Sequence, residues 1–121
     1  MNPDDFKRRT KAFGLAAWRL FARLPQTSTA QIPGRQLLRA ATSVGANYRA
    51  ACRARSAADF VAKMKIVEEE CDESLYWLEL LLEIGGVNIE SITLLRSEGN
   101  EILSITVASI RTARSHQSRA L

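Results

Sequence analysis

Histidine and cysteine are scarce in this sequence, which has one histidine and two cysteines among 121 residues. The histidine, His116, lies near the C-terminal end. A di-metal carboxylate centre in a helical bundle needs Glu-x-x-His pairs on facing helices, and a hydrolytic triad needs a histidine beside its nucleophile. Neither can form in the body of the domain, and no phosphate loop or dinucleotide motif is present. The sequence predicts a protein that is not an enzyme and binds no metal, cofactor or small-molecule substrate.

Long apolar runs are also missing. No stretch approaches the roughly 20 apolar residues that span a bilayer, and Met1–Asp5 lacks the basic and apolar regions of a signal peptide. A hydrophobic content of 46% is ordinary for a soluble domain. We therefore expect a single cytoplasmic domain with no membrane partner. Cys52 and Cys71 fall in helical apolar patterns and are predicted to be small buried residues rather than a disulfide or metal pair.

What the sequence does contain is helical periodicity. Between residues 57 and 84, apolar or small residues recur in steps of four and three, which is the spacing of one helix face: Phe60, Met64, Val67, Cys71, Ser74, Leu78 and Leu81. The preceding helix repeats this seam at Leu37, Ala41, Val44, Tyr48 and Ala51. Gly45 in its middle costs about 1 kcal/mol relative to alanine, which indicates a tight helix contact there.

Helix boundaries follow from capping residues and breakers. Asn2, Ser56 and Asn88 are expected N-caps, Pro25 ends the first helix, and Pro33 suits the first turn of the second. We expect one domain over residues 1–114 with a frayed tail at 115–121, and helices at about residues 3–24, 34–55, 57–84 and 89–114. Short connections predict an all-α, up-down-up-down antiparallel four-helix bundle.

The third predicted helix carries a second stripe at the same spacing, formed by Ile66, Glu70, Glu73, Trp77, Leu80 and Ile84. One core needs only one face per helix. The second stripe is therefore either part of a broad core capped by Trp77 or an oligomer interface, where aromatic residues are enriched. We favour the interface. Glu70 and Glu73 are either a paired acid site or, as we favour, part of a structural polar network with Ser43 and Asn47.

Charge is segregated along the chain. Residues 35–65 carry seven bases and one acid, whereas residues 66–101 carry one base and ten acids. The up-down-up-down topology gathers bases from all four helices at one pole, including Lys7, Lys11, Arg114 and Arg119. A basic pole is typical of a phosphate-backbone binder, although bases at helix C-termini also complement the helix dipole. The candidate nucleic-acid contacts are Arg8, Arg9, Arg49, Arg53, Arg55, Lys63, Lys65 and Arg111.

Two stretches resemble a known family. They are Leu38–Ser56 followed by Phe60, and Val67–Glu70 continuing to Leu78–Leu81. They are similar to the bacterial four-helix-bundle proteins encoded in intervening sequences of large-subunit ribosomal RNA genes, over roughly residues 13–110.

Many members of that family read Ser-Ile-Pro-x-Asn-Ile-Ala-Glu-Gly in the second helix. Here Ser43 and Asn47 remain, Gly45 replaces the proline, and Ala50-Ala51 replaces Glu-Gly, so any role of the family's glutamate does not carry over. The resemblance implies a homopentameric ring without established enzymatic activity. By fold-level analogy, a similar pentamer binds nucleic acid as the accessory protein of diversity-generating retroelements.

Together these observations predict a homo-oligomer, a pentamer by resemblance, whose partners are other copies of itself and RNA or DNA. Because no base-reading motif is present, binding through the basic pole would be independent of sequence and sensitive to salt. The alternative is a protein–protein interaction scaffold that binds no nucleic acid.

Overall fold

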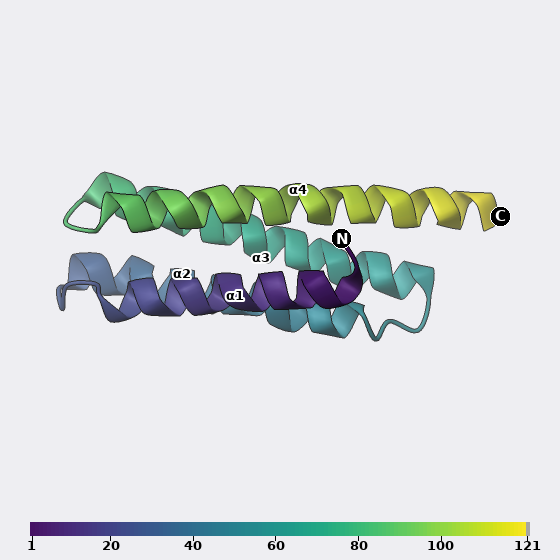
Figure 1. The fold of residues 1–121 in the computed structure, drawn as a ribbon, viewed down its shortest axis with the longest axis horizontal. Coiled ribbons are helices and arrows are strands. Elements are labelled where there is room, and N and C mark those ends of the chain that lie inside the picture. The colour runs from purple at the N-terminus through teal and green to yellow at the C-terminus, as the bar shows by residue number, and fades with distance from the viewer. Residues whose placement is uncertain (121) are drawn as a thin grey trace.

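The computed structural model describes the backbone of residues 1–120 and the side chains of residues 1–118. This part of the chain contains four α-helices and no strand, which confirms the all-α class (Figure 1). The helices are α1 (Pro3–Ala22), α2 (Ser28–Ala51), α3 (Ala57–Ile84) and α4 (Ile89–Ala120). Within residues 1–120, no helix combines the length and the apolar character that a membrane span requires.

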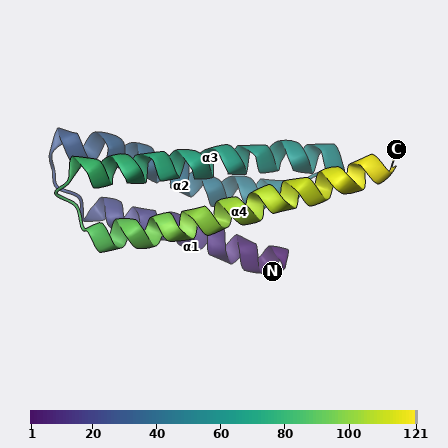
Figure 2. The ribbon, with the colours of Figure 1, turned by 90° about the horizontal axis from the view of Figure 1, so that it is seen from above.

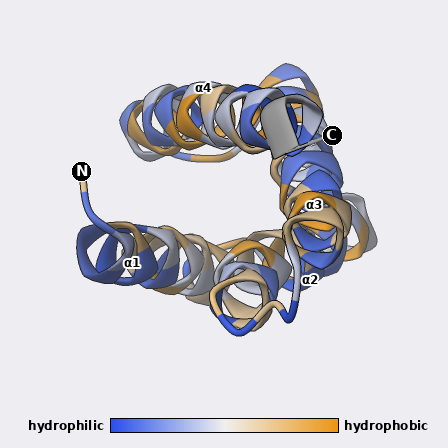
Figure 3. Ribbon diagram, turned by 90° about the vertical axis from the view of Figure 1, so that its right-hand side faces the viewer, coloured by the Kyte–Doolittle hydropathy of each residue, from blue (hydrophilic) through white to orange (hydrophobic). Residues whose placement is uncertain are grey.

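Each helix packs against the next one in the sequence, whereas α1 and α4 contact each other much less. Viewed along the helices, the ribbons follow one another around an open arc that has α1 and α4 at its two ends (Figure 3). The loops from α1 to α2 and from α3 to α4 lie at the same end of the molecule, where Figure 2 shows both. The connection from α2 to α3 lies at the opposite end, beside the N-terminal half of α1 (Figure 1).

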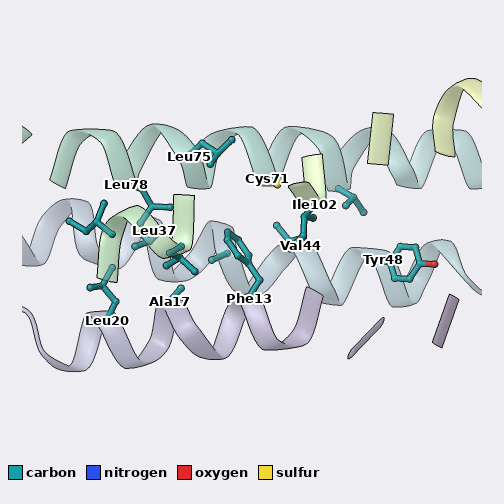
Figure 4. Close-up of a cluster of buried hydrophobic side chains, with 14 of the residues drawn as sticks. Phe13, Ala17, Leu20, Leu37, Val44, Tyr48, Cys71, Leu75, Leu78 and Ile102 are labelled. Atoms are coloured by element: carbon teal, nitrogen blue, oxygen red, sulfur yellow. The ribbon is translucent and has the colours of Figure 1, made fainter. Parts of the chain in front are cut away.

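The core forms where the predicted seams meet (Figure 4). All the residues of the α2 seam are buried, as are those of the α3 seam except Phe60, which is partly buried. Both cysteines are free, and Cys71 is buried as predicted, whereas Cys52, just after the end of α2, is only partly buried. Cys71 donates from Sγ to the carbonyl oxygen of Gly99 at 3.2 Å, and its burial raises the thiol pKa to about 12.

The expected caps are present. The backbone N–H of Asp5 donates to Oδ1 of Asn2 at 2.8 Å, and that of Ser91 donates to Oδ1 of Asn88 at 2.9 Å. Ser56 caps α3 by accepting from the N–H of Asp59 at 3.0 Å. These bonds satisfy N–H groups that the first turn of a helix leaves without partners.

Three helices differ from the predicted boundaries at their C-terminal ends. α1 ends at Ala22 rather than near residue 24. α2 ends at Ala51 rather than near residue 55, so residues 52–56 form the connection to α3. α4 continues to Ala120, beyond the predicted end at residue 114, so the tail expected to fray is helical as far as it is described. The sequence of this tail lacks apolar periodicity, but it also lacks a proline or glycine that would stop a helix.

The start of α2 is the largest difference. This helix begins at Ser28, with Thr27 as its N-cap residue, so Pro33 lies inside the helix rather than in its first turn. The carbonyl oxygen of Thr27 accepts from the N–H of Gln31 at 2.9 Å, and Gln31 in turn donates from Nε2 to the carbonyl oxygen of Pro25 at 3.0 Å. Pro33 is buried within the helix and has no N–H to donate to the carbonyl oxygen of Thr29, so the helix continues through it with one backbone hydrogen bond fewer.

Candidate nucleic-acid interface

A groove follows the line where α1 and α2 pack together. Its volume is about 470 Å³. No acidic side chain lines it, and basic side chains stand beside small and apolar ones: Lys7, Arg8, Thr10, Lys11, Gly14, Leu15 and Trp18 from α1, with Thr42, Gly45, Ala46, Arg49 and Arg53 from α2 and the residues after it.

Two glycines explain why the groove lies here. A Cβ atom at Gly45 would lie 3.3 Å from the backbone of Thr10 and Lys11. A Cβ atom at Gly14 would lie 3.4 Å from the Cα of Thr42. The two backbones therefore approach closely along a line of small residues, and longer side chains on either side form the walls. This confirms the tight contact predicted at Gly45.

The cations of the groove differ in how their charge is balanced. Lys7 and Arg8 form ion pairs with Asp4 and Asp5 of the first turn of α1. In contrast, the groove's other three basic side chains form no ion pair with any described residue and are exposed: Lys11, Arg49 and Arg53. Like charges around a concave surface add to one another's electrostatic potential. The part of the groove lined by Lys11, Arg49 and Arg53 therefore attracts anions.

The other end of the groove is apolar and exposed. Leu15 is 46% exposed and Trp18 is 57% exposed, although both are large hydrophobic side chains. Trp18 follows Lys11 by about two helical turns, so the two lie on the same face of α1, about 10 Å apart along its axis. A positive end and an aromatic end thus share one groove.

The remaining predicted cations lie elsewhere, and three are already paired. Arg9 donates from Nε and from Nη2 to Glu98 of α4, each at 2.7 Å, and lies 3.3 Å from Glu101. These hydrogen bonds, chiefly that to Glu98, raise the pKa of Arg9. Arg9 therefore links α1 to α4 instead of facing the groove.

Lys63 and Lys65 are engaged within α3. Lys63 donates to Asp59 at 2.7 Å, which lowers the pKa of that carboxyl, and Lys65 lies 3.3 Å from Glu68. Arg55 and Arg111 are exposed but do not line the groove. Of the predicted contacts, the structure brings together Arg8, Arg49 and Arg53, with Lys7 and Lys11 of the wider pole. The side chain of Arg119, another member of the pole, lies outside the described residues.

Sequence reasoning missed Leu15 and Trp18. Both lie outside the buried face of α1. They follow Lys7 and Lys11 at helical spacing on the exposed face, and this spacing is the signal that could have found them. A tryptophan on the exposed side of an amphipathic helix is the unusual feature, because a side chain of its size normally buries most of its area.

The second stripe of α3 is not enclosed within the chain. Ile66 is 43% exposed and Ile84 is 45% exposed, while Trp77 and Leu80 are partly buried. The Nε1 atom of Trp77 is buried and has no hydrogen-bond partner among the described residues.

Glu70 and Glu73 belong to a polar network, but not to the one that was predicted. Both carboxylates form ion pairs with Arg39 of α2, with 3.0 Å between Nη1 of Arg39 and Oε2 of Glu70. Ser43 and Asn47 instead donate to backbone carbonyl oxygens one turn earlier in α2, at 2.7 and 2.8 Å. Arginine reaches further than serine or asparagine, so it bridges the two helices where the shorter polar side chains bond locally.

Within residues 1–118, no three histidine, cysteine, aspartate or glutamate side chains are grouped so that they could hold a metal ion. The structure offers two surfaces instead, the α1–α2 groove and the second stripe of α3.

Comparison with known proteins identifies the relatives of this chain. A search of curated proteins gave no match. A crystal structure of a protein of unknown function from the S23 ribosomal protein family of Bacteroides thetaiotaomicron VPI-5482 is similar, with a TM-score of 0.84 and 31% sequence identity. The similarity covers 92% of this chain and 99% of that one. Residues 5–108 match the sequence model of the 23S rRNA-intervening sequence proteins. The chain therefore belongs to the 23S rRNA-intervening sequence protein family.

Proposed function

We propose that this protein is a non-enzymatic, cytoplasmic nucleic-acid-binding protein that holds a phosphate backbone in the α1–α2 groove. One observation carries the proposal: Lys11, Arg49 and Arg53 line a groove without acidic side chains and have no ion-pair partner among the described residues. The names of the family and of the similar structure both refer to ribosomal components. RNA is therefore the first ligand to test.

The groove favours contacts to phosphates over contacts to base edges. Lysine and arginine side chains neutralise phosphates and release the counterions condensed on the nucleic acid, which makes affinity fall steeply with salt. Sequence is read by side chains that reach base edges in a groove of the duplex. Besides its lysines and arginines, the groove is lined by threonine, glycine, alanine, leucine and tryptophan, with no asparagine or glutamine among the described lining residues. Binding is therefore expected to be independent of sequence.

Charge reversal in the groove tests this function. Fluorescence anisotropy with labelled RNA and DNA of mixed sequence should give an affinity that falls as salt rises from about 50 to 200 mM. The double variant Arg49→Glu, Arg53→Glu should lose binding. The matched control is Arg19→Glu, Arg23→Glu, which changes net charge equally but alters exposed arginines in the last turn and at the C-cap of α1, outside the groove.

Equal loss in both double variants would show that net charge, not the groove, governs binding. Absence of binding by the parent protein would remove the proposal in favour of the alternative, a protein-interaction scaffold. Helical content by circular dichroism and the midpoint of thermal unfolding, measured for all variants, separate loss of binding from loss of folding.

We further propose that the chain is an up-down-up-down bundle that assembles as a homo-oligomer, a pentameric ring, through the second stripe of α3. The exposure of Ile66 and Ile84 on this stripe supports an additional contact, because large apolar side chains left exposed on one face mark interaction sites. The partly buried indole of Trp77 on the same stripe supports it too, since aromatic side chains are enriched at interfaces. Light scattering should give several times the chain mass of 13.5 kDa.

A further inference from the structure

We infer that the α1–α2 groove selects single-stranded over double-stranded nucleic acid, with a base stacked on Trp18 and the neighbouring phosphates held by Lys11, Arg49 and Arg53. This inference rests on the proposed function and adds to it the class of nucleic acid that is bound. It is carried by the exposed indole at one end of a groove whose other end is cationic.

The size of the groove supports a single strand. Its volume of about 470 Å³ lies within the range of small-molecule sites. It can therefore take a short stretch of nucleotides but not the body of a duplex, in which the bases are stacked inside and unavailable to a protein side chain. In a single strand, the bases are free to leave the stack and present their faces.

The order of basic and aromatic side chains along α1 also fits a single strand of nucleic acid. Lys7, Lys11 and Trp18 recur at helical spacing on one face, so positive charge gives way to an aromatic ring over about 10 Å from Lys11 to Trp18. Leu15 stands between them and is itself 46% exposed. Proteins that bind single strands without sequence preference combine these parts, a basic groove along the backbone and aromatic side chains on which bases stack.

The side chain of Trp18 does not belong to the buried core, so stacking on a base would disrupt no core contact. Its side chain is 57% exposed, and it is not part of the buried cluster formed by the seams of the helices. Trp77, the other tryptophan, packs against that cluster. Trp18 can therefore be replaced without removing a core contact, which makes it a suitable position for a test.

The first experiment compares ligands and Trp18 variants. Oligouridine and a hairpin duplex with the same number of phosphates are titrated into the parent protein and into Trp18→Ala and Trp18→Phe. We expect the single strand to bind at least about tenfold more tightly than the duplex. Trp18→Ala should weaken single-strand binding by roughly tenfold and leave duplex binding unchanged, whereas Trp18→Phe should retain most of the preference.

Stacking has its own optical signature. In a Trp77→Phe background Trp18 is the sole tryptophan, and its emission should be quenched when oligouridine binds. Uridine monophosphate, and vesicles containing anionic lipid, serve as ligands that supply the same charge without a strand of bases. Neither should displace labelled oligouridine at an equal phosphate concentration.

Several outcomes would overturn the inference while leaving the proposed function intact. The first is equal affinity for the hairpin and the single strand. The second is that Trp18→Ala has no effect although Arg49→Glu, Arg53→Glu still abolishes binding. The third is that uridine monophosphate competes as effectively as oligouridine. A lower native mass for Trp18→Ala would assign the residue to a subunit contact instead. Binding to vesicles with no binding to either oligonucleotide would overturn both proposals.

Discussion

The α1–α2 groove and the second stripe of α3 each hold one tryptophan and involve arginine, but the arginines of the groove line it, whereas the arginine at the stripe reaches it from α2. In the groove, Arg49 and Arg53 have no ion-pair partner among the described residues, whereas beside the stripe Arg39 is held by Glu70 and Glu73. A cation that the chain leaves unpaired attracts an external anion. A face whose charges are already paired offers mainly its apolar surface, which suits contact with another protein copy.

The two tryptophans show the same contrast. Trp18 is mostly exposed at the end of a cationic groove, while Trp77 is partly buried and its enclosed Nε1 atom has no hydrogen-bond partner among residues 1–118. An exposed indole beside positive charge is suited to a planar aromatic ligand. A half-buried indole among apolar neighbours is typical of a protein interface. Residue type alone does not separate these roles, because the surroundings decide them.

The largest expected effect comes from placing a charge at each tryptophan. Trp77→Glu should dissociate the oligomer, because it would place an unpaired carboxylate in a contact that excludes water. Trp18→Glu should leave the native mass unchanged while weakening nucleic-acid binding. Light scattering on the two variants decides the comparison. An unchanged mass for Trp77→Glu would remove the second stripe as the interface, and a reduced mass for Trp18→Glu would move the interface to the groove.

The next effect concerns salt. If Arg49 neutralises a phosphate, Arg49→Gln should reduce the steepness of log affinity against log salt by about 0.7 for a single strand. Arg39→Gln removes the same charge from an arginine that is already paired, so it should leave that slope unchanged. Titrations at four or more salt concentrations measure both slopes. Equal changes would mean that the two arginines contribute only to the overall field of the protein.

A smaller effect is expected at the floor of the groove. Gly45→Ala should lower the free energy of unfolding by about 1 kcal/mol, because overpacking against the backbone of Thr10 and Lys11 outweighs the better helix propensity of alanine. Gly14→Ala should raise the free energy of unfolding by about 0.5 to 1 kcal/mol, since its Cβ finds ordinary contact distances. Urea unfolding of both variants provides the test. Stabilisation by Gly45→Ala would show that the helices can separate slightly.

The smallest effect is that of the Arg39–Glu70 pair. Arg39 is about half exposed within one chain, so its ion pair with Glu70 is screened by water. A double-mutant cycle with Arg39→Ala and Glu70→Ala, measured in the dissociated Trp77→Glu variant, should give a coupling free energy below about 1 kcal/mol. The coupling should be larger in the parent protein if the second stripe is covered there, since burial reduces screening. Identical values would indicate that this face remains in water.

Much of the fold could be predicted because it depends on interactions between residues that are close together in the sequence. Asn2, Ser56 and Asn88 cap their helices through side-chain oxygens that reach N–H groups three residues on, a distance that depends only on the chain nearby. The seams of α2 and α3 follow from the helical repeat. The start of α2 could not be predicted in this way, because it depends on contacts that keep Pro33 inside the helix.

The sequence by itself determined four amphipathic helices, three of their N-caps, the segregation of charge along the chain, a second stripe on α3 and a resemblance to the family. Only the tertiary structure decided which charges remain available. It paired Arg9 with Glu98 and Arg39 with Glu70 across helices, and it left Arg49 and Arg53 in the same groove as Trp18 without an ion-pair partner among the described residues. Helical periodicity depends on neighbours a few residues apart, whereas an ion pair between helices depends on how the backbones approach, and here Gly45 permits the close approach of α1 and α2.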